Sequence, residues 1–467
     1  MKIPFLNTSA SERRDMILCG GISKTLMLLA VPSLMMGLVQ SMMPLSDGLF
    51  INNIAGPYVA SAVTYCVPIL NMVVALSQGL GSAGMAVIGQ ANGRGDLAQG
   101  KKISSQLILL AFLLGIVSIP VMILLAFPIS AIVTKEISDI VWLYLVLNAF
   151  AMPFYFMEAV YNAVKNAAGQ PEATFVRMLL LLLLKILFNF LFIYLFPLGI
   201  VGCVLSSVLS NVIVCVMMFY ELFVRESEEK LEWPGIHLDH AIAMDLLRIG
   251  LPTMLSSVMM NLGFYLINNE VQKYGAIVLN GQGIASNITS ICFAMTGAFG
   301  PTVTTMVSMN MGAGKKDRAR RSMWVGCAFS ALTAAVLIAM IVPLVGPLTS
   351  LFTRNQEVLD MARTSLYIYI YSVIGFGVCM VQQGAFIGLG RTRIPLVISI
   401  LRIWLLRYLF ILATEKYLGV LSVFWGNLFS NLTAALIITL MVLRMPWESV
   451  LPNRPPRTAG GEGMSAG

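Results

Sequence analysis

Charged residues are scarce in this sequence. Asp, Glu, Lys and Arg make up 11% of its 467 residues, whereas soluble domains carry about 25%. Hydrophobic residues make up 58%, and the mean hydropathy is +0.84. This composition excludes a soluble enzyme and a disordered scaffold. The apolar runs are also much longer than an outer-membrane strand of about 10 residues, which excludes a transmembrane barrel.

Histidine and paired cysteines are scarce as well. The chain has two His, His237 and His240, and both lie in a charged segment between apolar blocks. Its seven Cys are scattered singly, without a C-x-x-C pair. We therefore expect no disulfide framework, no metal centre and no cofactor. The apolar blocks also lack His, paired carboxylates and a nucleophile with a base, so we expect no catalytic site.

Long apolar runs fill most of the chain. A backbone in lipid must satisfy its own polar groups, so each run of about 20 residues or more is expected to cross the bilayer as a helix. Twelve such blocks lie at about 25–50, 63–90, 104–133, 140–163, 178–198, 200–222, 250–272, 280–310, 322–350, 364–388, 395–414 and 419–443. We predict an all-α polytopic membrane protein with twelve transmembrane helices.

Basic residues are distributed unevenly between the segments that join these blocks. With the N-terminus in the cytoplasm, 22 of the 30 Lys and Arg lie on that side, 5 on the other and 3 inside the spans. The positive-inside rule therefore predicts a multi-pass protein of the inner (plasma) membrane with both termini in the cytoplasm. The same asymmetry explains the net charge of +8, so no nucleic-acid partner is expected.

The two halves of the chain share landmarks at one fixed offset. The offset that separates Pro32 from Pro252 also separates Asn211 from Asn431. Such a constant offset indicates two homologous halves. Each half has an even number of spans, so both should run in the same direction as parallel repeats. We therefore predict a 6+6 architecture around a central cleft that opens to alternate sides as the lobes rock.

This organisation predicts five segments. The lobes are joined by a charged linker, and the Gly- and Pro-rich end of the chain has little to bury, so it should be disordered. The segments are a cytoplasmic arm at 1–24, the N-lobe at 25–222, a cytoplasmic linker at 223–247, the C-lobe at 248–443 and a cytoplasmic tail at 444–467.

Charged side chains inside apolar spans are costly and usually face a cavity or a partner. Asp47 stands out among them, because it lies well inside the first block. A desolvated carboxylate there can load and release a proton near neutral pH, so we predict Asp47 as the ion-coupling residue. The alternatives are a fixed ion pair with Lys185 and an interfacial position at a helix end.

Five further polar or charged positions are assigned to the substrate cavity: Asn189, Lys185, Asn268, Glu270 and Arg402. Lys185 and Asn189 are one turn apart on one face of a helix, and a lysine there can pair with an acid or attract an anionic head group. Glu270 is close enough to the outer end of its span to be interfacial. Arg402 lies in the block that corresponds to the one containing Lys185.

Several segments resemble the multidrug and toxic compound extrusion (MATE) family. Residues 31–63, VPSLMMGLVQSMMPLSDGLFINNIAGPYVASAV, resemble its first span. The stretches 79–102 and 300–322 resemble its paired Q/N-x-x-G-x-G-(D/K) helix ends, and 351–362 and 385–399 resemble its spans 9–11. The resemblance covers about residues 20–443. It implies a 6+6 antiporter that exports drugs or toxic organic cations in exchange for H⁺ or Na⁺.

The resemblance also assigns residue roles. It makes Asp47 the coupling residue of the N-lobe and matches Asn189 to the Asn of the family's N-x-x-x-D pattern. The Asp of that pattern falls on Ile193, and block 364–388 contains no acid. A Na⁺ site needs several oxygen ligands, so H⁺ coupling is expected rather than Na⁺ coupling.

The leading hypothesis is thus a monomeric, proton-coupled exporter of small, amphipathic, cationic organic molecules. Lys185, Arg402 and Arg407 motivate an alternative, a flippase for an anionic lipid or lipid-linked sugar. A sodium-coupled exporter is the second alternative.

Overall fold

The computed structural model describes residues 10–50, 57–132, 135–227, 230–233, 235, 237–352 and 355–447. The side chains of some helical residues, including 44–50 and 268–269, lie outside this description. All regular elements among the described residues are helices. The sequence-based prediction of an all-α membrane protein is confirmed.

Ten described elements precede the linker. They are α1 (Ala10–Cys19), α2 (Ile22–Phe50), α3 (Pro57–Arg94), α4 (Leu97–Ile132), α5 (Lys135–Ala149), α6 (Met152–Ala167), α7 (Pro171–Asn189), η2 (Phe190–Leu195), α8 (Gly199–Phe219) and η3 (Tyr220–Val224). The η segments are π-helical continuations of the helices before them.

The structure describes ten elements after the linker. They are α9 (His240–Gln272), α10 (Ala276–Gly297), α11 (Phe299–Gly312), α12 (Lys316–Ser350), α13 (Gln356–Tyr369), α14 (Ser372–Gly388), α15 (Arg393–Ile400), η4 (Leu401–Tyr408), α16 (Leu409–Leu418) and α17 (Leu421–Arg444). Helix α9 begins inside the predicted linker, because Asp239 caps its N-terminus by accepting hydrogen bonds from the backbone N–H groups of Ala241 and Ile242.

Among the described residues, ten helices are long and apolar enough to span a membrane, and the number rises to twelve if each of two bent pairs is one span. The pair α5 and α6 bends by 48°, and the pair α13 and α14 by 45°. Both were predicted as continuous blocks. The first break is immediately followed by Pro153, which lacks a backbone N–H and begins a helix readily.

The two halves are built alike. The second segments of the bent pairs begin at Met152 and Ser372, which are separated by the same offset as Pro32 and Pro252. Gly199 and Gly419, again at that offset, lie at or just before the start of the last spans of their halves with φ of 57° and 55°. Only glycine adopts this left-handed conformation without strain. The offset found in the sequence is therefore an offset between equivalent structural positions.

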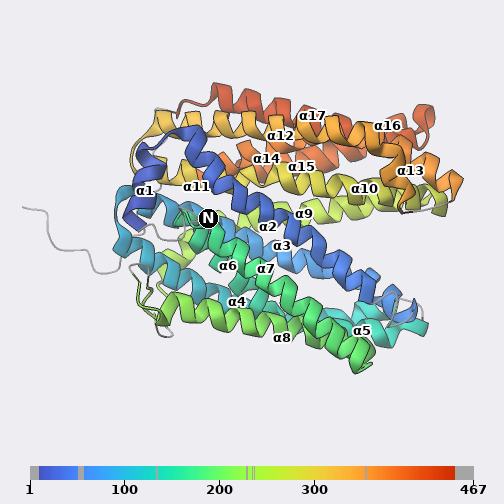
Figure 1. Ribbon diagram of the computed structural model, residues 1–467, viewed down its shortest axis with the longest axis horizontal. Coiled ribbons are helices and arrows are strands. Elements are labelled where there is room, and N and C mark those ends of the chain that lie inside the picture. Colours follow the sequence, from blue (N-terminus) through green and yellow to red (C-terminus); the bar gives the residue numbers. More distant parts are fainter. Residues whose placement is uncertain are drawn as a thin grey trace, which may run out of the picture.

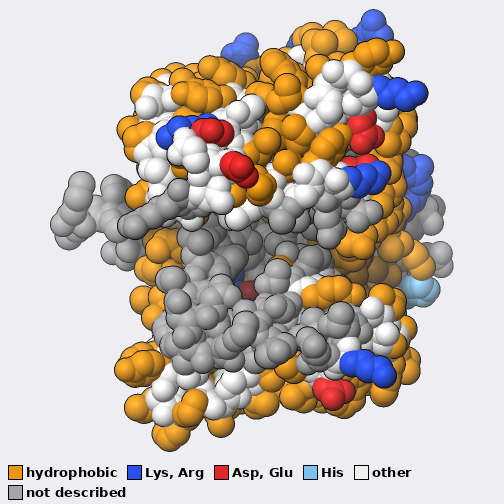
Figure 2. All heavy atoms as spheres, turned by 90° about the vertical axis from the view of Figure 1, so that its right-hand side faces the viewer, with side chains coloured by type: hydrophobic (Ala, Val, Ile, Leu, Met, Phe, Trp, Pro, Cys, Tyr) orange, Lys and Arg blue, Asp and Glu red, His pale blue; other side chains and the backbone are white. Residues whose placement is uncertain are grey.

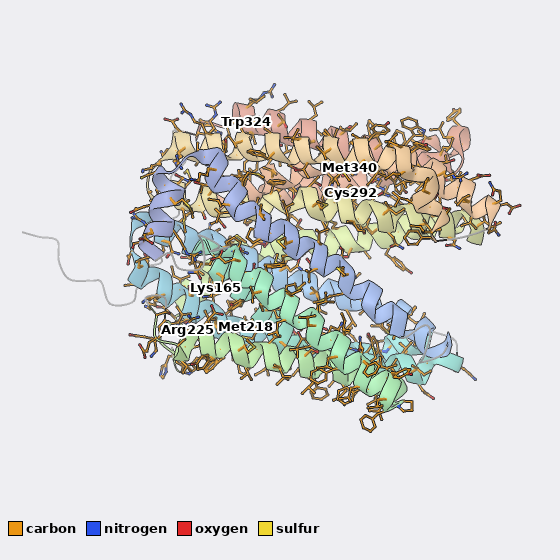
Figure 3. All side chains as sticks on the ribbon, viewed as in Figure 1. Lys165, Met218, Arg225, Cys292, Trp324 and Met340 are labelled. Carbon is orange, nitrogen blue, oxygen red and sulfur yellow. The ribbon has the colours of Figure 1, made fainter. Side chains whose placement is uncertain are left out.

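The helix bundle is closed at one end and divergent at the other. We name the first the basic end: it carries α1 and the α3–α4, α6–α7, α11–α12 and α14–α15 connections, which lie toward the left of Figure 1. Helices of the two lobes spread apart toward the opposite end, which Figure 2 views directly. Figure 3 shows side chains of the two helix groups, with Lys165 and Met218 in the N-lobe and Cys292, Trp324 and Met340 in the C-lobe.

Helix α2 packs against both lobes. Leu26, Leu29 and Ala30 in its first half are buried in the same hydrophobic cluster as Phe299 and Val303 of the C-lobe. Val39, further along, joins a cluster of the N-lobe. Helix α2 therefore crosses from one lobe to the other, as Figure 1 shows.

Candidate functional site

The lobes contact each other through backbone surfaces in the half nearer the basic end. Thr253 of α9 donates a 2.9 Å hydrogen bond to the carbonyl of Gly79 in α3. Gln90 of α3 donates a 2.9 Å bond to the carbonyl of Gly388, and Thr305 of α11 donates a 3.0 Å bond to that of Asn166. These interlobe hydrogen bonds join described residues of both lobes at one half of the bundle.

Glycines allow this close approach. A Cβ built on Gly93 of α3 would lie 2.0 Å from the carbonyl oxygen of Met309, and one on Gly312 of α11 would lie 2.1 Å from that of Gln90. Both distances are far below normal contact. The small residues of the 79–102 and 300–322 stretches thus let α3 and α11 touch backbone to backbone, as in other membrane helix pairs.

The polar residues predicted in the N-lobe fall on two helices. Asp47 lies in the last turn of α2, but its side chain is outside the described residues. Asn189 is 1% exposed, and its Oδ1 accepts a hydrogen bond from Ser206 of α8. Lys185, one turn earlier on α7, is half-buried. This hydrogen bond from Ser206 to Asn189 therefore links α7 to α8 inside the N-lobe.

The N-lobe also contains a buried ion pair that the sequence did not reveal. Nη1 of Arg177 in α7 lies 3.1 Å from Oε2 of Glu158 in α6, and these side chains are 5% and 13% exposed. Oε1 of Glu158 and Nε of Arg177 have no hydrogen-bond partner among the described groups. Arg177 lies just before the apolar block predicted at 178–198, so it was not among the charges placed inside the spans. A buried Glu158 that needs a cation was the signal that could have found the pair.

At the opposite end, Glu270 is buried and paired locally. Its carboxylate contacts the ammonium of Lys273 and accepts a 3.4 Å hydrogen bond from Tyr408. Lys273 itself is 57% exposed. Glu270 thus belongs to a local ion pair at the end of α9. Asn268, two residues earlier, has a side chain outside the described residues.

Arg402 is buried within the C-lobe. It is 3% exposed and donates hydrogen bonds to Oδ1 of Asn431 at 3.3 Å and to Sδ of Met260 at 3.3 Å. Its guanidinium carbon lies 5.2 Å from the ring centroid of Phe376, within cation–π range. Its Nε has no hydrogen-bond partner in the described part of the chain. Arg402 therefore joins α17, α9 and α14 through neutral groups.

A second buried cation follows one turn later. Arg407 is 7% exposed, lies 5.7 Å from the ring centroid of Phe264, and has an Nε that bonds to no described group. None of the ion pairs between side chains that the structure describes includes Arg402 or Arg407. Both lie in the π-helical segment η4, a distortion that is frequent at functional sites.

Across the described part of the chain, no group of three or more His, Cys, Asp or Glu could hold a metal ion. The described C-lobe and N-lobe sites differ in charge. The N-lobe pairs its buried cation Arg177 with an acid, whereas the C-lobe surrounds Arg402 and Arg407 with amide, thioether and aromatic groups.

Comparisons with known proteins agree with this architecture. A family model described as MatE matches the chain twice, over residues 32–191 and 252–412. The probable multidrug resistance protein YoeA of Bacillus subtilis (strain 168) is 23% identical over 392 residues, which cover 82% of this chain and 84% of the relative.

Two solved structures share the fold. One is described as the outward-facing conformation of a multidrug resistance MATE family transporter of the MOP superfamily, with a TM-score of 0.87 at 21% identity over 92% of this chain and 96% of its own. The other is a MOP superfamily transporter from Pyrococcus furiosus Vc1 (DSM3638), described as having a binding pocket of reverse polarity that suggests a different function. Its TM-score is 0.86 at 20% identity, over 92% of this chain and 96% of its own.

The two family matches begin at Pro32 and Pro252 and coincide with the repeats seen in the helices. The family's members are transporters rather than enzymes. This chain belongs to the MatE family, with one family unit in each lobe.

Proposed function

We propose that this protein is a secondary active exporter of amphipathic small molecules that works by rocking its two lobes. The observation that carries the proposal is the one-sided closure: backbone contacts join α3 to α9 and α11 in the half nearer the basic end, while the helices diverge beyond it. Two rigid repeats joined in this way alternate access by exchanging which end is closed. The description of the relative YoeA as a probable multidrug resistance protein supports drug-like cargo.

The proposed driving ion is H⁺, and the proposed coupling residue is Asp47. When deprotonated and facing the cytoplasm, its carboxylate would bind a cationic substrate. Protonation from outside would remove that charge and release the substrate. Ile193 stands where a second N-lobe carboxylate would complete an oxygen-rich cation site, which favours H⁺ over Na⁺.

The five cavity residues assigned from the sequence are also proposals. Lys185, Asn189, Asn268, Glu270 and Arg402 are proposed to tune the cavity, with Asn189 acting through its bond to Ser206 and Glu270 through its pair with Lys273. We also propose a monomer in the plasma membrane with both termini in the cytoplasm. The predicted disordered tail lies almost entirely outside the described residues.

The test is transport of ethidium, an organic cation, into inside-out proteoliposomes with separately imposed H⁺ and Na⁺ gradients. Wild type should respond to the H⁺ gradient, and Asp47→Asn should lose that response while it still folds. Asp139→Asn, at an exposed acid of α5, is the matched control and should behave as wild type. Proton-driven transport that survives in Asp47→Asn would overturn the coupling assignment.

A second candidate function is favoured by the buried Arg402 and Arg407, which pair with no described acid. A cation without a counter-charge in the membrane interior is costly, and a transported anion would supply that charge. This candidate is a flippase for an anionic lipid or lipid-linked sugar. The Pyrococcus furiosus transporter, which is described as having a binding pocket of reverse polarity, supports this candidate.

The two candidates are separated by competition. Dodecyltrimethylammonium and dodecyl phosphate have the same alkyl chain and opposite head groups. Competition against ethidium by the ammonium alone supports the exporter of cations. Transport of radiolabelled dodecyl phosphate that is lost in Arg402→Gln, and that resists collapse of the pH gradient, would support the flippase.

A further inference from the structure

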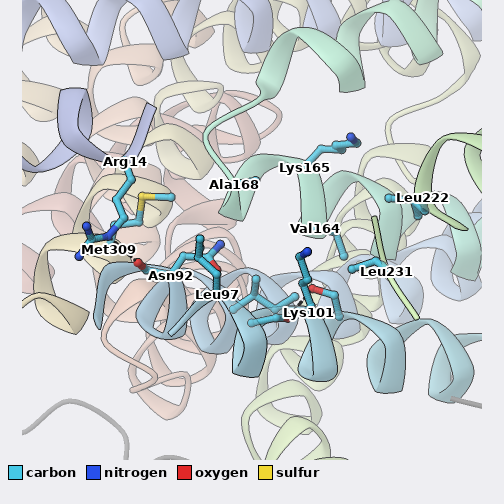
Figure 4. A pocket seen from close by; sticks show the side chains of 13 residues that line it. Arg14, Asn92, Leu97, Lys101, Val164, Lys165, Ala168, Leu222, Leu231 and Met309 are labelled. Atoms are coloured by element: carbon cyan, nitrogen blue, oxygen red, sulfur yellow. Dashed lines mark hydrogen bonds between the residues drawn. The ribbon is translucent and has the colours of Figure 1, made fainter. Parts of the chain in front are cut away.

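A cavity of about 630 Å³, its open mouth included, lies at the basic end. Its walls come from α1, α3, α4, α6 and α11 and from the chain around Leu222 and Leu231 (Figure 4). It is separate from Asp47 and from the buried Arg402, so the proposed transport mechanism does not use it.

Three basic residues line this cavity, and one of them lacks a partner among the described residues. Arg14 donates to the backbone carbonyls of Asn92 and Gly93 at 2.9 and 3.0 Å. Lys165 lies 2.7 Å from Oε1 of Glu221. Lys101 is half-buried and has no ion pair or hydrogen bond with any described group. Arg14 also lies 3.9 Å from Oδ1 of Asp15, so the excess positive charge of the cavity is that of Lys101.

The rest of the wall is apolar. Leu97, Val164, Leu222 and Leu231 line the cavity beside Lys101 (Figure 4). Leu222 and Leu231 are buried, whereas Leu97 is 42% exposed at the start of α4. A site with a free ammonium at one side and hydrocarbon at the other fits a ligand that carries an anionic head group and an apolar body. Basic pockets between helices at a membrane surface bind phosphate-bearing head groups in this way.

The cavity is completed by both lobes. Met309 of α11 lines it from the C-lobe, and the same residue's carbonyl is the close neighbour of Gly93 in α3. Arg14 holds the carbonyls of that same turn of α3. Opening the lobes at the basic end would carry Met309 away from the other walls. A ligand in the intact cavity must therefore favour the state in which this end is closed.

We propose that this cavity is a regulatory site for a phosphate-bearing amphiphile, whose phosphate binds Lys101 and whose occupancy stabilises the lobes closed at the basic end. The binding step is independent of the proposed function. Its effect on the lobes rests on the proposed rocking motion.

Binding is tested by thermal unfolding of the detergent-solubilised protein with four added compounds: dioleoyl phosphatidic acid, dioleoyl glycerol, glycerol 3-phosphate and inorganic phosphate. Phosphatidic acid should raise the unfolding temperature of wild type and Lys101→Arg. Its apparent affinity should be about tenfold weaker in Lys101→Gln, the loss expected for one charge-assisted bond. Arg393→Gln is the matched control, because Arg393 is an exposed cation of the C-lobe at the same end, and it should bind as wild type.

The other compounds identify the source of the phosphate. Stabilisation by phosphatidic acid alone assigns the site to a lipid head group. Equal, Lys101-dependent stabilisation by glycerol 3-phosphate or inorganic phosphate assigns it to a soluble phosphate. Equal stabilisation of wild type and Lys101→Gln, or stabilisation by dioleoyl glycerol as strong as by phosphatidic acid, would overturn the site.

The coupling to the lobes is measured by spin labels at Lys135→Cys and Gln356→Cys, exposed positions of α5 and α13 at the opposite end, in a Cys19→Ser background. The phosphate compound that binds should increase the population with the longer label distance, and this increase should be lost in Lys101→Gln. Lys101-dependent binding with an unchanged distance distribution would overturn the coupling while leaving the binding site intact. Failure of ethidium transport would overturn only the proposed function.

Discussion

The contact between Gly93 and Met309 provides a sharp test of the closure at the basic end. In Gly93→Ala the added methyl carbon would lie 2.0 Å from the Met309 carbonyl oxygen, where ordinary contact begins at about 3.4 Å. The clashing atom belongs to the backbone, so no rotamer change relieves it. Helices α3 and α11 must therefore move apart by more than an ångström, or the lobes must open at this end.

Overpacking of this kind costs about 1–3 kcal/mol. The clash exists only in the state closed at the basic end, so the cost acts on the ratio of the two states. A difference of about 1–3 kcal/mol corresponds to a change of about 5- to 150-fold in that ratio. Gly93→Ala should therefore move a large share of the molecules to the state that is open at the basic end.

The assay is the distance between spin labels at positions 135 and 356. In Gly93→Ala the distribution should shift to shorter distances, because the opposite end closes as the basic end opens. Gly312→Ala, whose Cβ would meet the Gln90 carbonyl at 2.1 Å, should shift in the same direction. Gly283→Ala in α10 is the control, since its Cβ meets no described atom within 4 Å. A distribution that stays as in wild type for both Gly93→Ala and Gly312→Ala would refute the closure.

Three further predictions concern other contacts. Glu158→Gln leaves Arg177 buried without its counter-charge and should cost about 3–5 kcal/mol of stability, measured as a lower unfolding temperature. The same substitution in an Arg177→Met background should cost less. An equal cost in both backgrounds would contradict the pair. The 2.9 Å hydrogen bond from Lys102 holds the pKa of Asp239 below its ordinary value. The stability it contributes should be present above the ordinary carboxyl pKa and be lost as pH falls through the lowered one, and Asp239→Asn should lack that part of the acid-unfolding curve. Cys19 is the exposed cysteine among the described residues, so a membrane-impermeant maleimide should label it in inside-out vesicles; labelling in intact cells instead would reverse the proposed topology.

The twelve spans and the repeat could be predicted from the sequence because lipid imposes a local rule. Every backbone polar group must be satisfied within its own segment, so a long apolar block such as 104–133 becomes a helix regardless of its neighbours. The repeat followed from the constant offset between landmarks such as Pro32 and Pro252. The bends at the predicted blocks 140–163 and 364–388 were missed. Hydropathy reports whether a segment enters the bilayer, but it does not report changes in the direction of the helix axis.

The partners of the charged residues could likewise be predicted only where they are local in the sequence. Glu270 and Lys273 form a local pair, three residues apart at the end of a helix. The sequence analysis had left open an interfacial position for Glu270. The pair of Arg177 and Glu158 was not predicted, because its two members lie on different helices. Charge and depth can be read from a sequence, but the partner of a buried charge is fixed by how helices pack.

The sequence by itself determined that this chain is a membrane transporter of two like halves, since hydropathy, charge asymmetry and repeat offset are properties of the linear chain. Only the tertiary structure decided that Arg402 and Arg407 sit among neutral groups, that Asn189 binds Ser206, and that glycines close the two lobes at the basic end. These features depend on distances between helices far apart in the chain. The packing of backbone against backbone fixes such distances, and no local pattern encodes them.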